Sequence, residues 1–354
     1  MKFFTSTVLW LLTFTIVYSQ SFDWGFGFGG LAHERGTAIC ADNQGNVIAA
    51  GYFNSNISSP GTGGMSLTNI GAGDGYLIKM DPDGYLQWVT QIGSGGEDRI
   101  VSIASGPNDE VYCLGYYGGG MLHIGDDTTI YDAISFPGRD MFIVKLDADG
   151  NHAWSGIIEG NDDIRPSSIA VDDAGNVVCV GRYDDAGGVD FDITSGTFNL
   201  YGNGSSAGNY VFILKMDENG NFLWAKTLDN TMNCHLRDVT TDNNGNIICA
   251  GSYNGAVDVD PGSGVHTLSS TGFSLNPFLI KLNTNGDFLW AADADATNSI
   301  AYSCATDAVG NVYTYGTFGG TIDLDPGVDI ANYTNSSGYS IFIQKLTPSG
   351  DYLW

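Results

Sequence analysis

Three pairs of aspartates are the feature of the sequence best suited to chemistry. One residue separates the two acids of each pair, and the pairs are Asp190/Asp192, Asp258/Asp260 and Asp323/Asp325. Hard cations such as Ca²⁺ favour clustered carboxylate and carbonyl oxygens, so these six residues are candidate calcium ligands. The alternation stops after two acids and no distal Glu follows, so a structural turn is the alternative interpretation.

Three arginines that stand beside an acid at related places form a second candidate site. They occur as Glu34-Arg35, Asp98-Arg99 and Asp163-Ile-Arg165. A guanidinium binds a carboxylate through two parallel hydrogen bonds, so Arg35, Arg99 and Arg165 could bind an anionic sugar or another carboxylate. Ion pairs between neighbouring repeats are the alternative. Arg237 lies two places away from the pattern and interrupts any ring of arginines.

No residue is predicted to be catalytic. The chain has 40 acidic residues, so carboxylate pairs that resemble a glycosidase centre arise easily by chance. The sequence contains no His-Glu-x-x-His, no Gly-x-Ser-x-Gly and no phosphate-binding loop. Nothing places a nucleophile beside a base. We therefore expect no cofactor other than calcium.

An internal repeat of the sequence indicates how the chain positions these candidate site residues. Six tryptophans are separated by 64, 66, 70, 66 and 64 residues: Trp24, Trp88, Trp154, Trp224, Trp290 and Trp354. A glycine follows each of the first five after 26 or 27 residues, and a lysine precedes each of the last five by nine residues. Constant spacing indicates strands that are paired in register, whereas the variable stretch between the glycine and the lysine indicates a loop.

Each repeat predicts four strands. The second strand ends at the glycine, as in Val177–Gly181, the third carries the lysine, as in Phe212–Met216, and the fourth carries the tryptophan. Tight turns rich in Asp, Asn and Gly join strands 1 and 2 and strands 3 and 4. The sequence therefore predicts an all-β fold, a β-propeller of four-stranded antiparallel blades. A right-handed β-solenoid is the alternative, although its coils are usually shorter.

The predicted propeller domain spans 21–354. It contains about five repeat units, at 24–88, 88–154, 154–224, 224–290 and 290–354. Both ends supply a fourth strand, so they would compete for one place if the ring closed. We expect a fragment of a larger propeller, with five-bladed closure as the alternative.

Three phrases of the repeat resemble a known family. They are Asp-x-x-Gly-Asn, then Val257–Gly262 or Ile322–Gly327, then Phe-Ile-x-Lys-Leu-Asp-x-x-Gly-x-x-Leu-Trp. Together they are similar to the SBBP repeat of secreted bacterial proteins, named for a seven-bladed β-propeller, over about residues 22–354. The resemblance implies a propeller fold and export, and says little about ligands. The second unit departs from the first phrase, reading Gly106-Pro-Asn-Asp-Glu110, and the fifth reads Thr347-Pro-Ser-Gly350 in its turn.

The N-terminus indicates export. Met1–Gln20 has a basic residue at Lys2, an apolar stretch from Phe3 to Val17 and a small residue at Ser19, which is typical of a secretory signal peptide. The stretch is short for a membrane anchor, and no later segment is apolar enough to span a bilayer. We expect a secreted or cell-surface protein with no membrane span after cleavage.

The net charge of the chain limits the class of partner that it can bind. The net charge is −27, and without Lys2 it is 12 − 40 = −28, so nucleic acid is not an expected partner.

Cys113, Cys179 and Cys249 occupy one place in three blades, too far apart for the ~7 Å limit of a disulfide, and are predicted to be buried. The redox state of Cys40, Cys234 and Cys304 is left open.

The functional prediction is an exported, non-catalytic propeller that binds a glycan or a protein at a cell surface, or scaffolds there. The alternative is a polysaccharide lyase or glycoside hydrolase on the same fold, assisted by calcium. Connections between strands 2 and 3 vary most and leave the sheets on the same side as the connections from strand 4 to strand 1. We therefore expect them to crowd one binding face.

Overall fold

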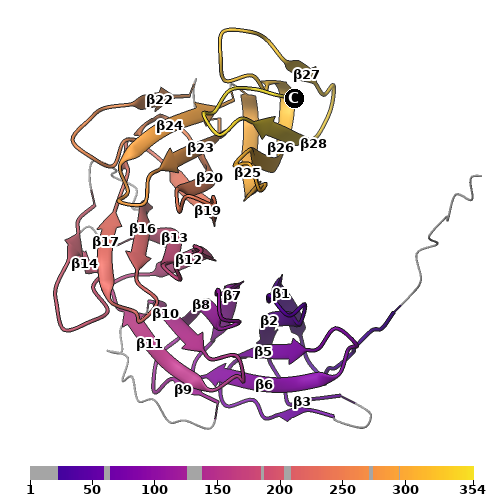
Figure 1. Ribbon diagram of the computed structural model, residues 1–354. Helices are drawn as coiled ribbons and strands as arrows, with labels where there is room; N and C mark the ends of the chain where they lie inside the picture. The colour runs from indigo at the N-terminus through magenta and orange to yellow at the C-terminus, as the bar shows by residue number, and fades with distance from the viewer. Residues whose placement is uncertain are drawn as a thin grey trace, which may run out of the picture.

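The computed structural model describes residues 23–59, 64–125, 138–184, 187–202, 209–270, 274–294 and 296–354. These residues form an arc of five small antiparallel sheets, each with its first strand toward the centre and its last strand at the periphery (Figure 1). Each sheet is one blade of a β-propeller, so the predicted all-β fold class is confirmed. The leader predicted at Met1–Gln20 lies outside the described residues.

In the first four blades the strands lie side by side in chain order. Blade 1 contains β1 (Glu34–Ala41), β2 (Val47–Phe53), β5 (Asp74–Met80) and β6 (Leu86–Gly93), and blade 2 contains β7 (Arg99–Ser105), β8 (Val111–Tyr117), β10 (Asp140–Leu146) and β11 (His152–Ile158). Blade 3 contains β12 (Ile164–Val171), β13 (Val177–Tyr183), β16 (Tyr210–Met216) and β17 (Phe222–Lys226), and blade 4 contains β19 (Cys234–Thr241), β20 (Ile247–Tyr253), β23 (Asn276–Leu282) and β24 (Phe288–Asp293). Blade 5 contains β25 (Ala296–Thr306), β26 (Val312–Asp323) and β28 (Ser340–Leu346).

The core lies between the blades. The second and third strands of a blade are covered on both faces, so they carry continuous apolar runs rather than alternating ones, and β10 and β16 are buried along their whole length. Cys113, Cys179 and Cys249 are fully buried and unbridged at equivalent places of this core, as predicted. Cys234 and Cys304 are also buried free thiols, and Cys40 is a half-buried one.

Strand 2 runs at least two residues past the repeated glycine in every blade, so the prediction that it ends there is wrong. The glycine is required by a close approach of two chain segments. A Cβ atom on Gly181 would lie 2.5 Å from the Arg165 carbonyl oxygen and 2.7 Å from the Phe212 ring. The same contacts, at 2.0 to 2.3 Å from a strand-1 carbonyl oxygen, recur at four places: Gly51, Gly115, Gly251 and Gly316. A glycine therefore recurs at this place because strands 1 and 3 pack too closely around strand 2 to leave room for a side chain.

A hydrogen-bond arrangement, which we call the clasp, joins each blade to the next. Its acceptor is the carbonyl oxygen of the second residue in the turn between strands 3 and 4. The Thr284 carbonyl of blade 4 accepts from Lys215 Nζ at 3.3 Å and from Trp224 Nε1 at 3.2 Å, both of blade 3. Three other carbonyls accept from an equivalent lysine and tryptophan: Ala148 from Lys79 and Trp88, Glu218 from Lys145 and Trp154, and Pro348 from Lys281 and Trp290.

The lysine of each clasp is also paired with an acid of its own blade. Lys215 lies 3.2 Å from Asp172, and their side chains are only 3% and 4% exposed. In blade 2 the acid is Glu110, 3.1 Å from Lys145. Glu110 explains the departure of this blade from the Asp-x-x-Gly-Asn phrase, because Gly106 brings no carboxylate and Glu110 supplies one from the other end of the turn.

The loops between strands 2 and 3 do not crowd one face, so that expectation is wrong. Their described parts fold over the outer edge of the arc (Figure 1). In blade 2 the loop strand β9 (His123–Ile124) pairs with β6 of blade 1. In blade 4, β21 (Ala256–Asp258) pairs with β18 (Asp229–Asn230), which follows the outer strand of blade 3. An outer strand exposes unpaired backbone groups, and these loops cover them.

Three of these loops contain a short hairpin of their own, and a fourth extends a blade strand. The pairs are β3 (Ile57–Ser58) with β4 (Ser66–Leu67), β14 (Val189–Asp190) with β15 (Asn199–Leu200), β21 with β22 (Thr267–Ser269), and β26 with β27 (Asn332–Thr334). The described parts of these loops thus form an outer belt that contains short β-strands.

The arc is open, with blade 1 and blade 5 at its two ends (Figure 1). Ile39 of blade 1 is 72% exposed, whereas the residues at its place in the next blades, Ile103, Ile169 and Val239, are 4 to 7% exposed. Closure by five blades, the alternative considered above, is not seen in the described residues. These residues also include no helix able to cross a membrane.

We predict that Gly181→Ala destabilises the chain by about 2 kcal/mol, because the added methyl group meets a backbone carbonyl that cannot move away. Gly95→Ala is the matched control: Gly95 is exposed, no atom lies within 4 Å of the place its Cβ would take, and the effect should stay within about 0.5 kcal/mol. Urea unfolding of both variants measures the difference. Equal effects would contradict the close-packing role of the repeated glycine.

Candidate functional site

The Asp-x-Asp pairs cap turns of the outer belt. The Asp258 carboxylate accepts hydrogen bonds from the backbone N–H groups of Asp260 at 3.1 Å and His266 at 2.8 Å. Asp190 and Asp323 accept the equivalent pair of bonds from residues two and eight places further on. The second acid of each pair, as in Asp260 with the N–H of Gly262 at 2.8 Å, caps the following turn.

These contacts account for one oxygen of each carboxylate. Among the described residues no group of three or more His, Cys, Asp and Glu side chains is arranged to hold a metal ion. A calcium ion bound at Asp190, Asp192, Asp258, Asp260, Asp323 or Asp325 would therefore need carbonyl or water oxygens as its remaining ligands. Calcium binding stays a prediction.

The predicted arginines lie at the start of the inner strand in three blades. The pairing of strand 1 with strand 2 shows which residues occupy equivalent places in different blades. Arg35, Arg99 and Arg165 lie opposite Tyr52, Tyr116 and Arg182, each the first residue after the strand-2 glycine. The residue at this place in blade 4 is His235, opposite Ser252, rather than Arg237. The three arginines therefore share one end of the inner strands, on successive blades.

The surroundings of the three arginines differ. Arg35 is exposed. The Arg99 guanidinium lies 4.1 Å from the Tyr52 ring centroid and is paired with Glu97, which also lies 3.0 Å from Arg139. Arg99 and Arg139 are thus engaged in ion pairs, as the alternative interpretation of the pattern suggested, although the acid lies in the same blade.

Blades 3 and 4 bring together four side chains that we call the basic cluster: Arg165, Arg182, His235 and Arg237. Arg165 is neutralised by Asp163, which lies 2.6 Å from its Nη2, and by Asp184 at 3.6 Å. Arg182 Nη1 donates instead to the amide oxygen of Asn209 at 2.8 Å, and lies 3.1 Å from His235 Nδ1. No carboxylate of the described residues lies within 4.0 Å of the Arg182 or Arg237 guanidinium.

Arg237 reaches the basic cluster because it is a β-bulge residue. The register of β19 with β20 shifts between Leu236 and Asp238, which leaves Arg237 outside the ladder. Bulges redirect a side chain and are common beside functional sites. The Arg237 guanidinium lies 5.7 Å from the ring centroid of Tyr302, the bulge residue of blade 5, and its buried Nε has no hydrogen-bond partner among the described residues.

The electrostatics of the basic cluster follow from burial and like charge. Burial, followed by the charges of Arg182, Arg237 and Arg165, lowers the pKa of His235 to about 4, so this ring is neutral at pH 7. Burial also lowers the pKa of Arg182 and of Arg237, and the Arg165 charge adds to the effect at Arg182. The cluster is thus a partly buried concentration of positive charge in an acidic chain.

The acids with the most perturbed pKa values are not placed for catalysis on a substrate. Burial raises the pKa of Asp98 and of Asp140 to about 6, a range that suits a general acid. Asp98 is fully buried and its carboxylate accepts a 2.6 Å hydrogen bond from Ser94 Oγ, and Asp140 is 7% exposed. A substrate cannot reach either carboxylate in this conformation.

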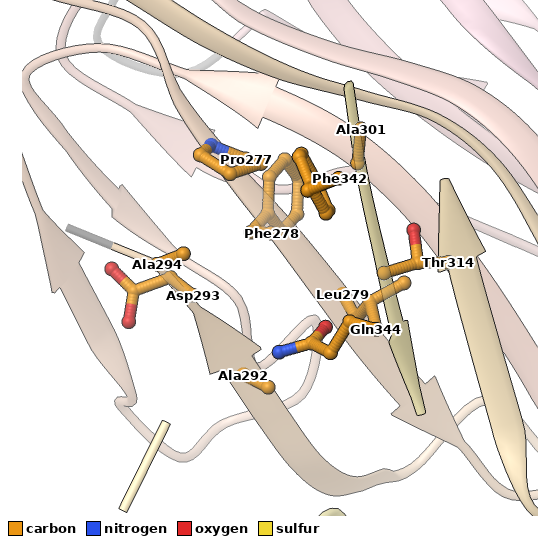
Figure 2. A pocket seen from close by; sticks show the side chains of 10 residues that line it. All are labelled: Pro277, Phe278, Leu279, Ala292, Asp293, Ala294, Ala301, Thr314, Phe342 and Gln344. Atoms are coloured by element: carbon orange, nitrogen blue, oxygen red, sulfur yellow. The ribbon is translucent and has the colours of Figure 1, made fainter. Parts of the chain in front are cut away.

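The cavity between blades 4 and 5 is a packing gap. Figure 2 shows side chains of β23, β24, β25, β26 and β28 around it, among them Phe278 and Phe342. Its volume is about 10 Å³, which leaves room for one water molecule at most. A larger hollow of about 540 Å³ opens over the clasp of blades 3 and 4, where Lys215 and Asp172 are already paired.

Comparison with known proteins supports the repeat and the fold. The chain is 25% identical over 325 residues to an uncharacterized WD repeat-containing protein, L264, of Acanthamoeba polyphaga mimivirus, which covers 77% of this chain and 23% of that protein. The chain thus spans less than a quarter of the length of this relative. No family model matches the chain, so the SBBP resemblance is not confirmed, whereas a propeller repeat is supported.

Solved structures resemble the chain more loosely. A protein of unknown function from Bacteroides caccae is 11% identical with a TM-score of 0.33, covering 79% of this chain and 88% of that one. A calcium-binding protein, regucalcin, from Agrobacterium tumefaciens is 12% identical with a TM-score of 0.33, covering 79% and 81%. Likenesses at this level concern the fold and carry no information on the ligand.

We predict that Asp258→Ala destabilises the chain by about 1–2 kcal/mol, because two backbone N–H groups lose their acceptor. Asp258→Asn keeps an acceptor oxygen in the same place and should lose less than half as much. Thermal unfolding in the presence of a chelator measures both. A loss in Asp258→Asn as large as that in Asp258→Ala would contradict the capping role.

Proposed function

We propose that the chain is a non-catalytic binding module whose anionic ligand is held by the basic cluster, which lies on the first two strands of blade 3 and the first strand of blade 4. The observation that supports this is that the guanidinium groups of Arg182 and Arg237 face neutral partners, whereas Arg99, Arg139 and Arg165 each have a carboxylate within 4.0 Å. A ligand carboxylate would complete the charge balance of the cluster through bidentate contacts.

The charge of the basic cluster limits how many negative charges the ligand can carry. Three guanidinium groups, a neutral His235 and the carboxylates of Asp163 and Asp184 sum to 3 − 2 = +1. The whole chain carries −27, which repels dense polyanions such as nucleic acids. A ligand with isolated carboxylates, as in an acidic glycan or an acidic surface of a protein, fits this balance.

Export is part of the proposal. The signal-peptide pattern of Met1–Gln20 and the repeat that resembles SBBP proteins both suggest a secreted or surface location, where glycans and surface proteins are the available partners. The alternative, a polysaccharide lyase or glycoside hydrolase, needs two accessible carboxylates across a bound sugar. Asp98 and Asp140, the acids with pKa values suited to that role, are enclosed.

The experiment is a binding titration of the purified chain with immobilised polygalacturonate, immobilised poly-L-glutamate and immobilised neutral dextran. We expect binding to at least one acidic polymer and none to dextran. Arg182→Gln should weaken acidic binding about tenfold or more, because one charge-assisted contact contributes at least about 1.5 kcal/mol. Binding should also fall as salt rises.

Arg139→Gln is the matched control, since Arg139 is a half-exposed arginine already paired with Glu97. It changes the net charge of the chain by the same amount as Arg182→Gln and should alter binding less than twofold. Equal weakening by the two variants would mean that general charge, rather than the basic cluster, holds the ligand. Failure of both acidic polymers to bind would contradict the proposed function.

A further inference from the structure

Two exposed tyrosines of blade 5 adjoin the basic cluster. Tyr302 and Tyr315 are each 42% exposed, with ring centroids 6.0 Å apart and ring planes at 34°. Tyr302 is the ring over which the Arg237 guanidinium lies, at 5.7 Å. An aromatic surface therefore continues directly from the Arg237 guanidinium.

Tyr302 and Tyr315 are exposed because blade 5 ends the described arc, since Val180 and Ala250, at the place of Tyr315 in blades 3 and 4, are fully buried. A β-bulge places Tyr302 beside Arg237. In each blade strand 1 shifts register by one residue, and the bulge residues are Thr37, Val101, Ser167, Arg237 and Tyr302. Only blades 4 and 5 place a large polar or aromatic side chain there, and these two side chains contact each other. Neighbouring bulges thus build a combined charged and aromatic surface at this one junction.

We propose that the ligand of the basic cluster is an acidic oligosaccharide, whose uronate carboxylate binds Arg182 and Arg237 while an adjoining sugar ring stacks on Tyr302. This inference rests on the proposed function and names its ligand class. A pyranose ring has one face of C–H groups that packs on an aromatic ring. Its hydroxyl groups both donate and accept hydrogen bonds, and the neutral His235 ring offers a polar group beside Arg182.

An acidic protein segment fits these features less well. A peptide presents flexible carboxylates and gains little from a flat ring at a fixed distance from the charges, whereas the rigid uronate unit holds its carboxylate and its apolar face in one geometry. The single excess positive charge of the cluster also suits one carboxylate per sugar unit. Tetra-L-glutamate therefore serves as the competing ligand in the test.

The experiment is isothermal titration of the full chain with tetragalacturonate. We expect Tyr302→Ala to weaken binding about tenfold, because a lost aromatic contact of about 1.5 kcal/mol corresponds to that change. Tyr302→Phe keeps the ring and should bind within about twofold of the wild type. Tyr85→Ala, at a tyrosine that is 70% exposed in the turn between strands 3 and 4 of blade 1, is the control and should have no effect.

The outcomes separate the inference from the proposed function. If Arg182→Gln weakens tetragalacturonate binding but Tyr302→Ala does not, the stacking inference fails and an anion-binding function stands. If tetra-L-glutamate binds as tightly as tetragalacturonate, the ligand class is wrong. If neither ligand binds the wild-type chain, both the inference and the proposed function fail.

Discussion

The structure depends on the clasp, in which one carbonyl oxygen accepts from a buried lysine and a tryptophan of the preceding blade. The lysine cannot be buried alone, since an unpaired charge in the interior is strongly unfavourable. It is therefore neutralised by an acid from the first turn of its own blade, as Asp172 neutralises Lys215 at 3.2 Å. Three elements of two blades are thereby fixed relative to one another, which explains why the lysine-to-tryptophan spacing never varies.

This constraint leaves the rest of each blade free to diverge in two regions. At the outer edge the loop between strands 2 and 3 varies in length, because it only has to cover the backbone of outer strands such as β6. On the inner side of the blades, the start of strand 1 and the facing end of strand 2 vary in charge, and there Arg182, His235 and Arg237 lie close together. The proposed binding site is thus built at positions that the clasp does not use.

The sequence predicted the fold well, because the fold is repeated. The repeated glycine has a direct structural cause in the close approach at Gly181 and its equivalents. The period of the tryptophans has one in the clasp, to which each of four tryptophans donates a hydrogen bond. The site was predicted only in part. Arg165 is a predicted residue that belongs to the basic cluster, whereas the sequence pattern does not indicate Arg182. Arg237 does not fit the spacing of the other arginines, because it occupies a bulge in β19 and a bulge has no sequence signal of its own. The outer course of the loops was missed for a similar reason, since strand-edge pairing is a tertiary contact.

The most direct test of this account compares Lys215→Met with Lys345→Met by urea unfolding. Both lysines pair with an acid of their own blade, but only Lys215 also reaches a carbonyl of the next blade, while Lys345 and Asp307 are 20% and 29% exposed. The account predicts a loss of about 3 kcal/mol for Lys215→Met, which leaves Asp172 buried and unpaired, and a much smaller loss for Lys345→Met. Equal losses in the two variants would contradict the clasp as the interaction that orders the blades.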